Sequence, residues 1–198
     1  MNFDLSALSV ERIRSGALKD TLPELYDLEQ IVENNLWHLE QNVFDHSIAA
    51  LQALDEYTSK RFELRDENYA LLRAAVLLHD IGKLKAFYVN TSGQTSAPSH
   101  AQMGRWLTTP ILRRLGFTND ETAYVSNLIG DHILVCDLLE LTVKTGRQEY
   151  IEILKAQRPH MWRELLLIAY ADIQGCKGSA EVKKEIYART SLINNNLE

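Results

Sequence analysis

An apolar run at residues 74–78 leads directly into His79-Asp80, and Ile81-Gly82-Lys83 follows at once. The run predicts a helix that buries one face and ends near Asp80, before Gly82. Taking an imidazole and a carboxylate out of water at this helix end costs free energy unless a partner compensates. A divalent first-row metal ion fits, because such ions accept nitrogen and oxygen ligands together. The chain must therefore fold so that His79 and Asp80 meet a compensating partner.

Helical patterning extends through most of the chain. Only four prolines and nine glycines interrupt the 198 residues, and alternating β-branched residues are scarce. We therefore expect an all-α fold, with residues 84–99 as an irregular loop or a short hairpin. The expected helices are one or two short ones within 4–19, then Leu22 to about Leu39, about Val43 to Lys60, about Glu67 to Asp80, about His100 to Leu115, Asn119 to about Ile133, 135–143, 147–156, Pro159 to Ile173 and Glu181 to about Ile193.

The composition is that of an ordinary globular protein, with 45% hydrophobic and 24% charged residues. The chain is long enough for one domain with a sizeable core, and we expect a single domain over 1–198. The net charge of −6 does not indicate nucleic acid as the main partner, because phosphate binding needs concentrated Lys and Arg. The net charge does not exclude binding to nucleic acid, and it allows a local basic pocket for one small phosphate ester.

Two further features bear on location. Cys136 and Cys176 form no CxxC pair, which favours reduced thiols. No apolar run reaches transmembrane length, and the N-terminus lacks a basic start followed by an apolar stretch. We therefore expect a cytoplasmic protein without a membrane partner, and the sequence does not indicate its oligomeric state.

Other candidate ligands lie on either side of His79-Asp80. They are His46 upstream, and His100, His132 and Asp172 downstream. Residues three, four or seven positions apart share one face of a helix. By this spacing, His46, His79, His132 and Asp172 each share a face with apolar residues. Four separate helices would thus each turn one metal-capable group inward, and Asp172 in particular needs a partner, because unpaired carboxylates are rare in a protein core.

Each of these residues taken alone has an ordinary explanation. An inward histidine is more often a hydrogen-bonded core residue than a ligand, Asp80 could cap a helix end, and His100 could lie on the surface. Taken together these explanations are weaker, because four separate helices would each have to place such a group on the inward face by chance. The two other histidines are interpreted as non-ligands, since His38 falls near a predicted helix end and His160 at a predicted helix start.

The order of these residues resembles the HD-domain superfamily of metal-dependent phosphohydrolases. It is most similar to the HD domain of bacterial tRNA nucleotidyltransferases and to the cyclic-dinucleotide phosphodiesterases that carry the same His-Asp-x-Gly-Lys. The resemblance implies an HD-domain helical bundle around a metal centre, with a core over about 21–178, short N-terminal helices and a C-terminal helix. The matching segments are His38-x7-His46, Leu78-His79-Asp80-Ile81-Gly82-Lys83, Ser99-His100-x3-Gly104, Asp131-His132 and Ala171-Asp172-x2-Gly175.

The resemblance also implies a set of roles. His100 and His132 match the extra histidines of two-metal members, in which the equivalent of Asp80 bridges both ions. Lys83 matches a lysine that contacts phosphate. The implied cofactor is one or two divalent ions, such as Mn²⁺, Fe²⁺, Ni²⁺, Co²⁺ or Mg²⁺, held by His46, His79, Asp80, His100, His132 and Asp172.

Departures from the family patterns narrow the expectation. Residue 42 is Asn where some three-metal members carry a carboxylate, which argues against a third ion. Residue 133 is Ile rather than a second histidine, and no Gly-Tyr-Pro follows, which argues against cyclic-dinucleotide specificity. The chain lacks the Gly-Ser and paired-Asp head of a nucleotidyltransferase, so we do not expect it to add nucleotides.

These observations predict a metal-dependent phosphohydrolase, either a phosphodiesterase or a phosphatase. Its substrate would be a small nucleotide-like ester, as a 2′,3′-cyclic phosphodiester or a phosphomonoester. The ions would activate a water and hold the phosphate oxygens, with Asp80 and Lys83 as catalytic residues. Without the motif, Lys83 would be interpreted as a solvated cation at a helix end. The alternatives are an HD module that senses a nucleotide without hydrolysing it and a structural helical domain without metal.

Overall fold

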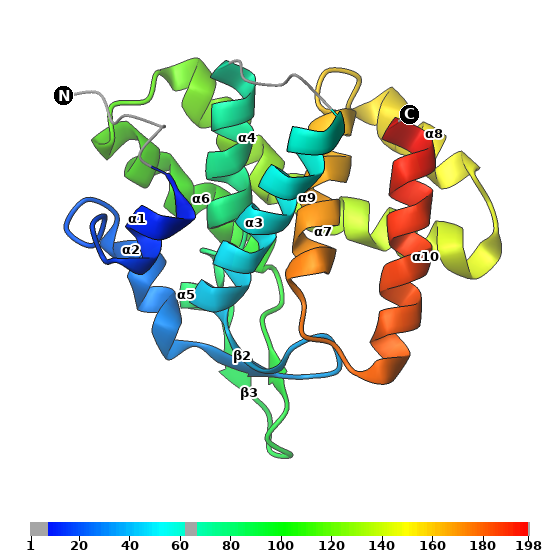
Figure 1. Cartoon of the computed structure of the whole chain (residues 1–198), viewed down its shortest axis with the longest axis horizontal. Helices are drawn as coiled ribbons and strands as arrows, with labels where there is room; N and C mark the ends of the chain where they lie inside the picture. The colour runs from blue at the N-terminus through cyan, green and yellow to red at the C-terminus, as the bar shows by residue number, and fades with distance from the viewer. Residues whose placement is uncertain (1–7, 62–66, 198) are drawn as a thin grey trace.

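The computed structural model describes residues 8–61 and 67–197, and helices dominate them, as the sequence predicts (Figure 1). Two short antiparallel hairpins accompany the helices. In chain order the elements are α1 (Val10–Arg14), α2 (Pro23–Asp27), a 3-10 helix (Leu28–Gln30), β1 (Val32–Asn34), β2 (Leu39–Asn42), α3 (Val43–Arg61), α4 (Glu67–Leu78), α5 (Lys83–Ala86), β3 (Tyr88–Val89), β4 (Thr95–Ser96), α6 (His100–Arg114), α7 (Asn119–Thr145), α8 (Glu149–Gln157), α9 (Trp162–Gly175) and α10 (Ala180–Leu197).

Four helices, α3, α4, α7 and α9, pack around a common interior. Helix α3 contacts α4 and α9, and both α4 and α9 also contact α7. Helix α6 packs along α7, while α10 lies against α9 and α7. The two hairpins lie together at one end of this bundle, at the bottom of Figure 1, and strand β1 contacts β4 there.

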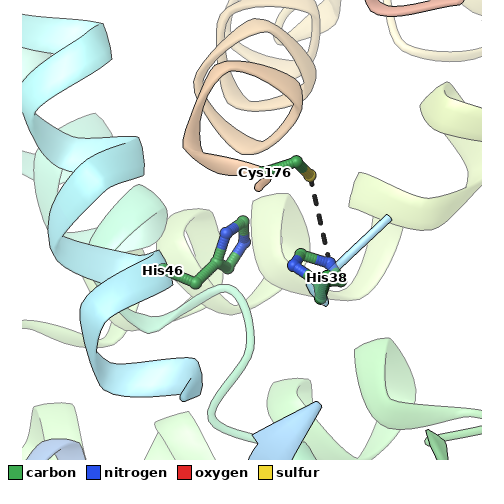
Figure 2. A group of neighbouring side chains, drawn as sticks. All are labelled: His38, His46 and Cys176. Atoms are coloured by element: carbon green, nitrogen blue, oxygen red, sulfur yellow. Dashed lines mark hydrogen bonds between the residues drawn. The ribbon is translucent and has the colours of Figure 1, made fainter. Parts of the chain in front are cut away.

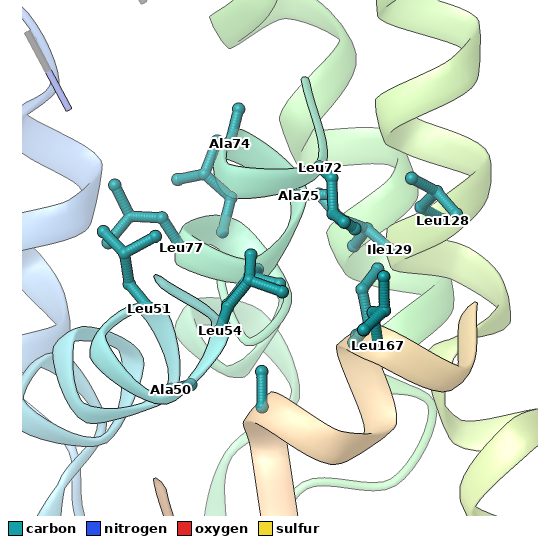
Figure 3. Close-up of a cluster of buried hydrophobic side chains, with 14 of the residues drawn as sticks. Ala50, Leu51, Leu54, Leu72, Ala74, Ala75, Leu77, Leu128, Ile129 and Leu167 are labelled. Atoms are coloured by element: carbon teal, nitrogen blue, oxygen red, sulfur yellow. The ribbon is translucent and has the colours of Figure 1, made fainter. Parts of the chain in front are cut away.

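Aliphatic side chains from all four central helices meet in the core (Figure 3). Leu54 of α3, Leu72 of α4, Ile129 of α7 and Leu167 of α9 are each at most 3% exposed. Burying a side chain of this size stabilises the folded chain by about 1.5–3 kcal/mol. The same four segments carry candidate ligands, so the core holds those ligands in fixed relative positions.

The short hairpin, one of the two structures expected within residues 84–99, is confirmed, but a short helix that was not expected precedes it. Residues 84–99 form the end of short helix α5 and then the hairpin of β3 and β4, in which Tyr88 pairs with Ser96 and Val89 with Thr95. The helix expected from about Val43 to Lys60 is also confirmed, since α3 runs over Val43–Arg61.

The helix expected from Leu22 to Leu39 is wrong in its second half. Helical structure ends at Gln30, and the chain then forms the hairpin of β1 and β2. The side-chain oxygen of Asn35 accepts hydrogen bonds from the backbone N–H groups of Trp37 and His38, at 2.9 and 3.0 Å. Such local side-chain bonds compete with helical hydrogen bonding and favour a turn. The turn moves His38 from a helix end to a hairpin loop.

The helices expected at Asn119–Ile133 and 135–143 are one continuous helix, α7. Val135, Leu138 and Leu139 continue its buried face beyond Ile133, so nothing in the packing ends the helix there. It ends at Gly146, whose φ of 72° is a left-handed conformation that glycine adopts readily. Among the residues described, no helix is long and apolar enough to cross a membrane.

Candidate metal centre

All six predicted ligands converge at the end of the bundle that faces the hairpins. His46, His79, Asp80 and His132 are at most 2% exposed, as expected for groups on apolar helix faces. The ligands come from α3 (His46), the turn after α4 (His79 and Asp80), the first residue of α6 (His100), α7 (His132) and α9 (Asp172).

The first group comprises His46, His79, Asp172 and one oxygen of Asp80. The Nε2 atoms of His46 and His79 lie 3.2 Å apart. Oδ1 of Asp172 lies 3.1 Å from His46 Nε2 and 3.6 Å from His79 Nε2. Oδ2 of Asp80 lies 3.5 and 3.3 Å from the same two nitrogens. Each of the two histidine nitrogens therefore lies 3.1–3.6 Å from both carboxylate oxygens.

The second group uses the other oxygen of Asp80. Nε2 of His100 lies 3.3 Å from Oδ1 of Asp80 and 3.2 Å from Nε2 of His132. The Asp80 carboxylate thus stands between the two groups, with one oxygen facing each. The arrangement is that of a carboxylate able to bridge two ions.

Backbone carbonyls orient three of the histidines. Nδ1 of His79, His100 and His132 lies 2.7, 2.8 and 2.6 Å, respectively, from the carbonyl oxygen of the residue three positions earlier. A carbonyl can only accept a hydrogen bond, so each Nδ1 carries the proton and each Nε2 presents a lone pair in the neutral ring. This arrangement is typical of histidines that ligate metals, because the second hydrogen bond fixes the tautomer and the ring orientation.

The donor spacing fits a first-row divalent ion. Bonds of about 2.0–2.2 Å in tetrahedral or octahedral geometry separate neighbouring donors by about 2.8–3.6 Å. The closest donor contacts in both groups fall within this range, from 3.1 to 3.6 Å. Lone pairs of imidazoles and carboxylates packed this closely repel one another unless a cation or a proton lies among them.

The electrostatics of the site favour a cation. Burial alone would raise the pKa of Asp80, but the charges of Lys83 and His79 outweigh it and hold that pKa well below its usual range. Burial likewise opposes ionisation of Asp172, yet hydrogen bonds from His46 and His79 lower its pKa. Burial and the nearby His100 and His79 lower the pKa of His132 to about 3. Both carboxylates are therefore ionised and His132 is neutral at neutral pH, which are the forms that bind metal. Burial opposes a charge on His79, but the carboxylates of Asp80 and Asp172 raise its pKa to about 10. Without an ion, His79 therefore holds a proton at neutral pH, and a bound ion would displace that proton.

Lys83 does not lie in solvent as an isolated helix-end cation. It is 5% exposed, and its Nζ donates hydrogen bonds of 2.8 Å to Oδ2 of Asp80 and 2.8 Å to Oε2 of Glu33. Glu33, on strand β1, is 4% exposed and was not predicted as a site residue. The two carboxylates outweigh the effect of burial and raise the pKa of Lys83, so its charge is retained.

Replacing Lys83 by methionine should lower the free energy of unfolding of chelator-treated protein by about 3–5 kcal/mol, as expected when one partner of a buried ion pair is lost. The reason is that Asp80 and Glu33 would remain as buried carboxylates without the cation between them. Urea denaturation measures the change. Lys85→Met is the matched control, because Lys85 is exposed on the same short helix and its loss should cost less than about 0.5 kcal/mol.

A second substitution distinguishes the loss of the Lys83 charge from the loss of side-chain packing. Adding Glu33→Gln to the Lys83→Met variant should recover part of the lost stability, because it removes one of the two uncompensated charges. A Lys83→Met protein as stable as the wild type would contradict the buried ion pair.

His38 is buried, which contradicts its interpretation as a surface or helix-end residue. It lies in the loop between β1 and β2, where its Nε2 is 3.9 Å from Sγ of Cys176 (Figure 2) and 3.7 Å from Oε2 of Glu33. The spacing His38-x7-His46 was the sequence signal that tied it to the site. His160, in contrast, is exposed, as its interpretation as a non-ligand requires.

His38, His46 and Cys176 form a third group of potential donors (Figure 2). Burial, together with the carboxylate of Asp172, raises the pKa of the Cys176 thiol far above neutrality. A thiol binds metal as the thiolate. The group therefore lacks the ionised ligand that the other two groups have in Asp172 and Asp80.

Residues of both main groups line a cavity of about 610 Å³. Asp80, Lys83, His100, His132 and Asp172 line its inner end, and residues of the two hairpins line its outer part. A small ligand that enters the cavity therefore meets the metal-capable groups directly.

Comparisons with known proteins agree with this geometry. The family model of the HD domain matches residues 43–172. The chain is 33% identical over 120 residues to the A-adding tRNA nucleotidyltransferase of Deinococcus radiodurans, covering 60% of this chain and 26% of that protein. It is 25% identical over 181 residues to the multifunctional CCA protein of Legionella pneumophila strain Paris, covering 91% of this chain and 40% of that protein. The chain thus spans less than half the length of these relatives.

Proposed function

Because this chain belongs to the HD-domain family, we propose that it is a metal-dependent phosphohydrolase acting on nucleotide-like phosphate esters. Domains of this family bind divalent metals, and the His and Asp clusters of this chain could hold such ions. The observation that carries the proposal is the position of Asp80, whose two oxygens each face a different group of histidines.

The ligand roles follow from the two groups. His46, His79 and Asp172 would hold the first ion with Oδ2 of Asp80, and His100 and His132 would hold the second with Oδ1. When bound, the ions would hold the phosphate oxygens and supply an activated water for in-line attack. The carbonyl-bound Nδ1 atoms keep the histidine rings in place, so the ligands need little rearrangement when a substrate arrives.

Lys83 would act on the phosphate. Its ammonium borders the cavity beside Asp80, and Glu33 holds it there from the opposite side. A fixed charge in a buried site stabilises developing negative charge on phosphate better than a solvated lysine does. In this proposal Lys83 is a catalytic residue, and Glu33 is a positioning residue that acts through it.

The proposed substrates are small nucleotides, with 2′,3′-cyclic nucleotides as the first choice. One relative is named as a tRNA nucleotidyltransferase, which supports a substrate of nucleotide chemistry. Hydrolysis is the proposed reaction, because metal-capable residues of both groups and Lys83 line one cavity that a small phosphate ester could enter.

The test combines metal analysis with a substrate screen. Chelator-treated protein reconstituted with Mn²⁺, Ni²⁺, Co²⁺ or Mg²⁺ should bind at least one ion per chain and hydrolyse a 2′,3′-cyclic nucleotide, a nucleoside monophosphate or bis-(p-nitrophenyl) phosphate. Metal uptake with nucleotide binding but no turnover would favour a sensing module. Absence of both metal and turnover would refute the site.

His132→Ala should lower the number of bound ions while one ion remains in the first group. His132 contributes only to the second group, because its Nε2 faces His100. Elemental analysis of the reconstituted variant measures the ratio of metal to protein, and His160→Ala, at an exposed histidine, is the matched control. An unchanged metal ratio and an unchanged rate in His132→Ala would indicate a single-ion centre.

A further inference from the structure

The outer part of the cavity has a composition different from that of the metal centre. We propose that it is a nucleobase subsite, in which the base of a nucleotide stacks on Trp37 while the phosphate lies at the histidines and Lys83. This inference rests on the proposed function, because it takes the metal centre as the place of the phosphate. It goes further by assigning the base to a particular wall of the cavity.

The two hairpins form that wall. Asn35 and Trp37 come from the β1–β2 loop, and Asn90 and Gln94 come from the β3–β4 hairpin. The backbone N–H of Asn34 donates a 2.8 Å hydrogen bond to Oγ1 of Thr95, which ties the hairpins to each other. Both hairpins thus contribute residues to the cavity that the metal-capable groups also line.

A buried cation contacts the ring of Trp37. The guanidinium of Arg189 lies 4.8 Å from the centroid of its ring. Arg189, on α10, is itself 4% exposed and forms ion pairs with Glu140 and Glu185. Trp37 is half-buried and also lines the cavity, so a ligand entering there meets an indole that Arg189 already contacts. A prepositioned aromatic ring loses little conformational entropy when a flat ligand binds to it.

The polar residues of the wall suit a base more than a second phosphate. Asn35, Asn90 and Gln94 are uncharged amides. Glu33 also comes from a hairpin and lines the cavity, but its carboxylate is paired with Lys83. The side-chain oxygens of the three amides accept hydrogen bonds within the hairpins, which leaves the side-chain N–H groups of Asn35 and Gln94 to donate to acceptors on the edge of a base. Aromatic stacking combined with polar edge contacts is the usual way in which proteins hold single bases.

The size of the cavity agrees with a mononucleotide. Pockets for ligands of this class enclose about 300–1,000 Å³, and this cavity encloses about 610 Å³. A nucleotide could arrive free or as the end of an RNA strand, and both present the same base and phosphate. We take the free nucleotide as the occupant, because the net charge of −6 does not indicate nucleic acid as the main partner.

The test measures binding without relying on hydrolysis. Calorimetry on Mn²⁺-reconstituted protein would use the phosphonate analogue of adenosine monophosphate, which cannot be hydrolysed, and inorganic phosphate as a separate probe. Trp37→Ala should weaken the binding of the nucleotide analogue about 10- to 100-fold, as expected for the loss of one base–aromatic stack. Its binding of phosphate should change less than twofold. Trp37→Phe should retain most of the affinity because it keeps an aromatic face.

Trp106→Ala is the matched control, since Trp106 is 66% exposed on α6 and does not line the cavity. Equal losses for the nucleotide analogue and for phosphate in Trp37→Ala would overturn the subsite, because they would indicate a general disturbance of the site. An unchanged affinity for the analogue would overturn it as well.

Two further measurements are needed. The first distinguishes a free nucleotide from the end of an RNA strand, and the second distinguishes the base subsite from the proposed hydrolysis. A trinucleotide with a 3′-terminal phosphate that bound tighter than the mononucleotide analogue would overturn the assignment to a free nucleotide. Loss of turnover in every assay, with Trp37-dependent binding retained, would refute hydrolysis and leave the base subsite standing.

Discussion

Asp80→Asn is expected to lower the rate of phosphate-ester hydrolysis at least about 10³-fold, because metal-held phosphate stabilisation is worth several kcal/mol and each 1.4 kcal/mol is a factor of about ten. The substitution keeps the size of the side chain but removes the charge that faces both groups of histidines. The ratio of metal to protein should fall at the same time, since a neutral amide cannot bridge two cations as a carboxylate does. Steady-state kinetics and elemental analysis on the same preparation measure both effects.

The matched control for this variant is Asp137→Asn, because Asp137 is exposed on α7. It should retain both the wild-type rate and the wild-type metal content. Helical circular dichroism should remain close to wild type in both variants, since Asp80 lies beyond the end of α4 and Asp137 lies in solvent. An Asp80→Asn protein that keeps wild-type turnover would contradict the catalytic assignment.

Gly82→Ala is expected to lower the free energy of unfolding by about 3 kcal/mol, at the upper end of the usual cost of overpacking. A Cβ at Gly82 would lie 1.9 Å from the carbonyl oxygen of His100 and 2.5 Å from the backbone nitrogen of Gly104. Both contacts are with the backbone of α6, so the helix itself would have to move. His100 is the first residue of that helix, and its Nε2 would leave its place beside Asp80.

The backbone conformation of Gly82 shows that the expected loss of stability would not come from backbone strain. Its φ of −65° and ψ of −18° suit alanine, so the expected loss comes from the clash alone. Gly16→Ala is the contrasting control, because Gly16 has a φ of +78° but open space around it. That variant should lose only about 1 kcal/mol, from the left-handed backbone conformation. Urea denaturation compares the two, and a Gly82→Ala protein no less stable than Gly16→Ala would refute the close packing.

Periodicity alone located most of the candidate ligands. His46, His132 and Asp172 are found on the inward faces that their helical spacing predicts, and His79-Asp80 follows the end of an apolar helix. These predictions held because the face of a helix on which a residue lies depends only on spacing along the chain. The family resemblance identified these residues, in this order, as candidate metal ligands. The structure added the distances of 3.1–3.6 Å between their closest donor atoms.

The predictions that failed concern residues 31–42 and residue 134. The local hydrogen bonds of Asn35 convert an expected helix into a hairpin, and the buried face of α7 carries that helix past an expected break. In both places two local structures were compatible with the same residues. Local side-chain hydrogen bonds decided the first case, and burial of Val135, Leu138 and Leu139 against the rest of the bundle decided the second. The spacing of apolar residues encodes neither.

The sequence by itself determined the all-α class, the inward faces and the set of residues able to bind metal, because these follow from local periodicity and side-chain chemistry. Only the tertiary structure decided that Glu33 holds Lys83, that His38 is buried and that Trp37 lines the same cavity as the metal-capable residues. These three residues lie on the first hairpin, some fifty residues from Lys83 in the chain. Their contacts arise because the hairpins pack against one end of the helical bundle. That packing joins segments far apart in the chain, so local sequence patterns do not reveal it.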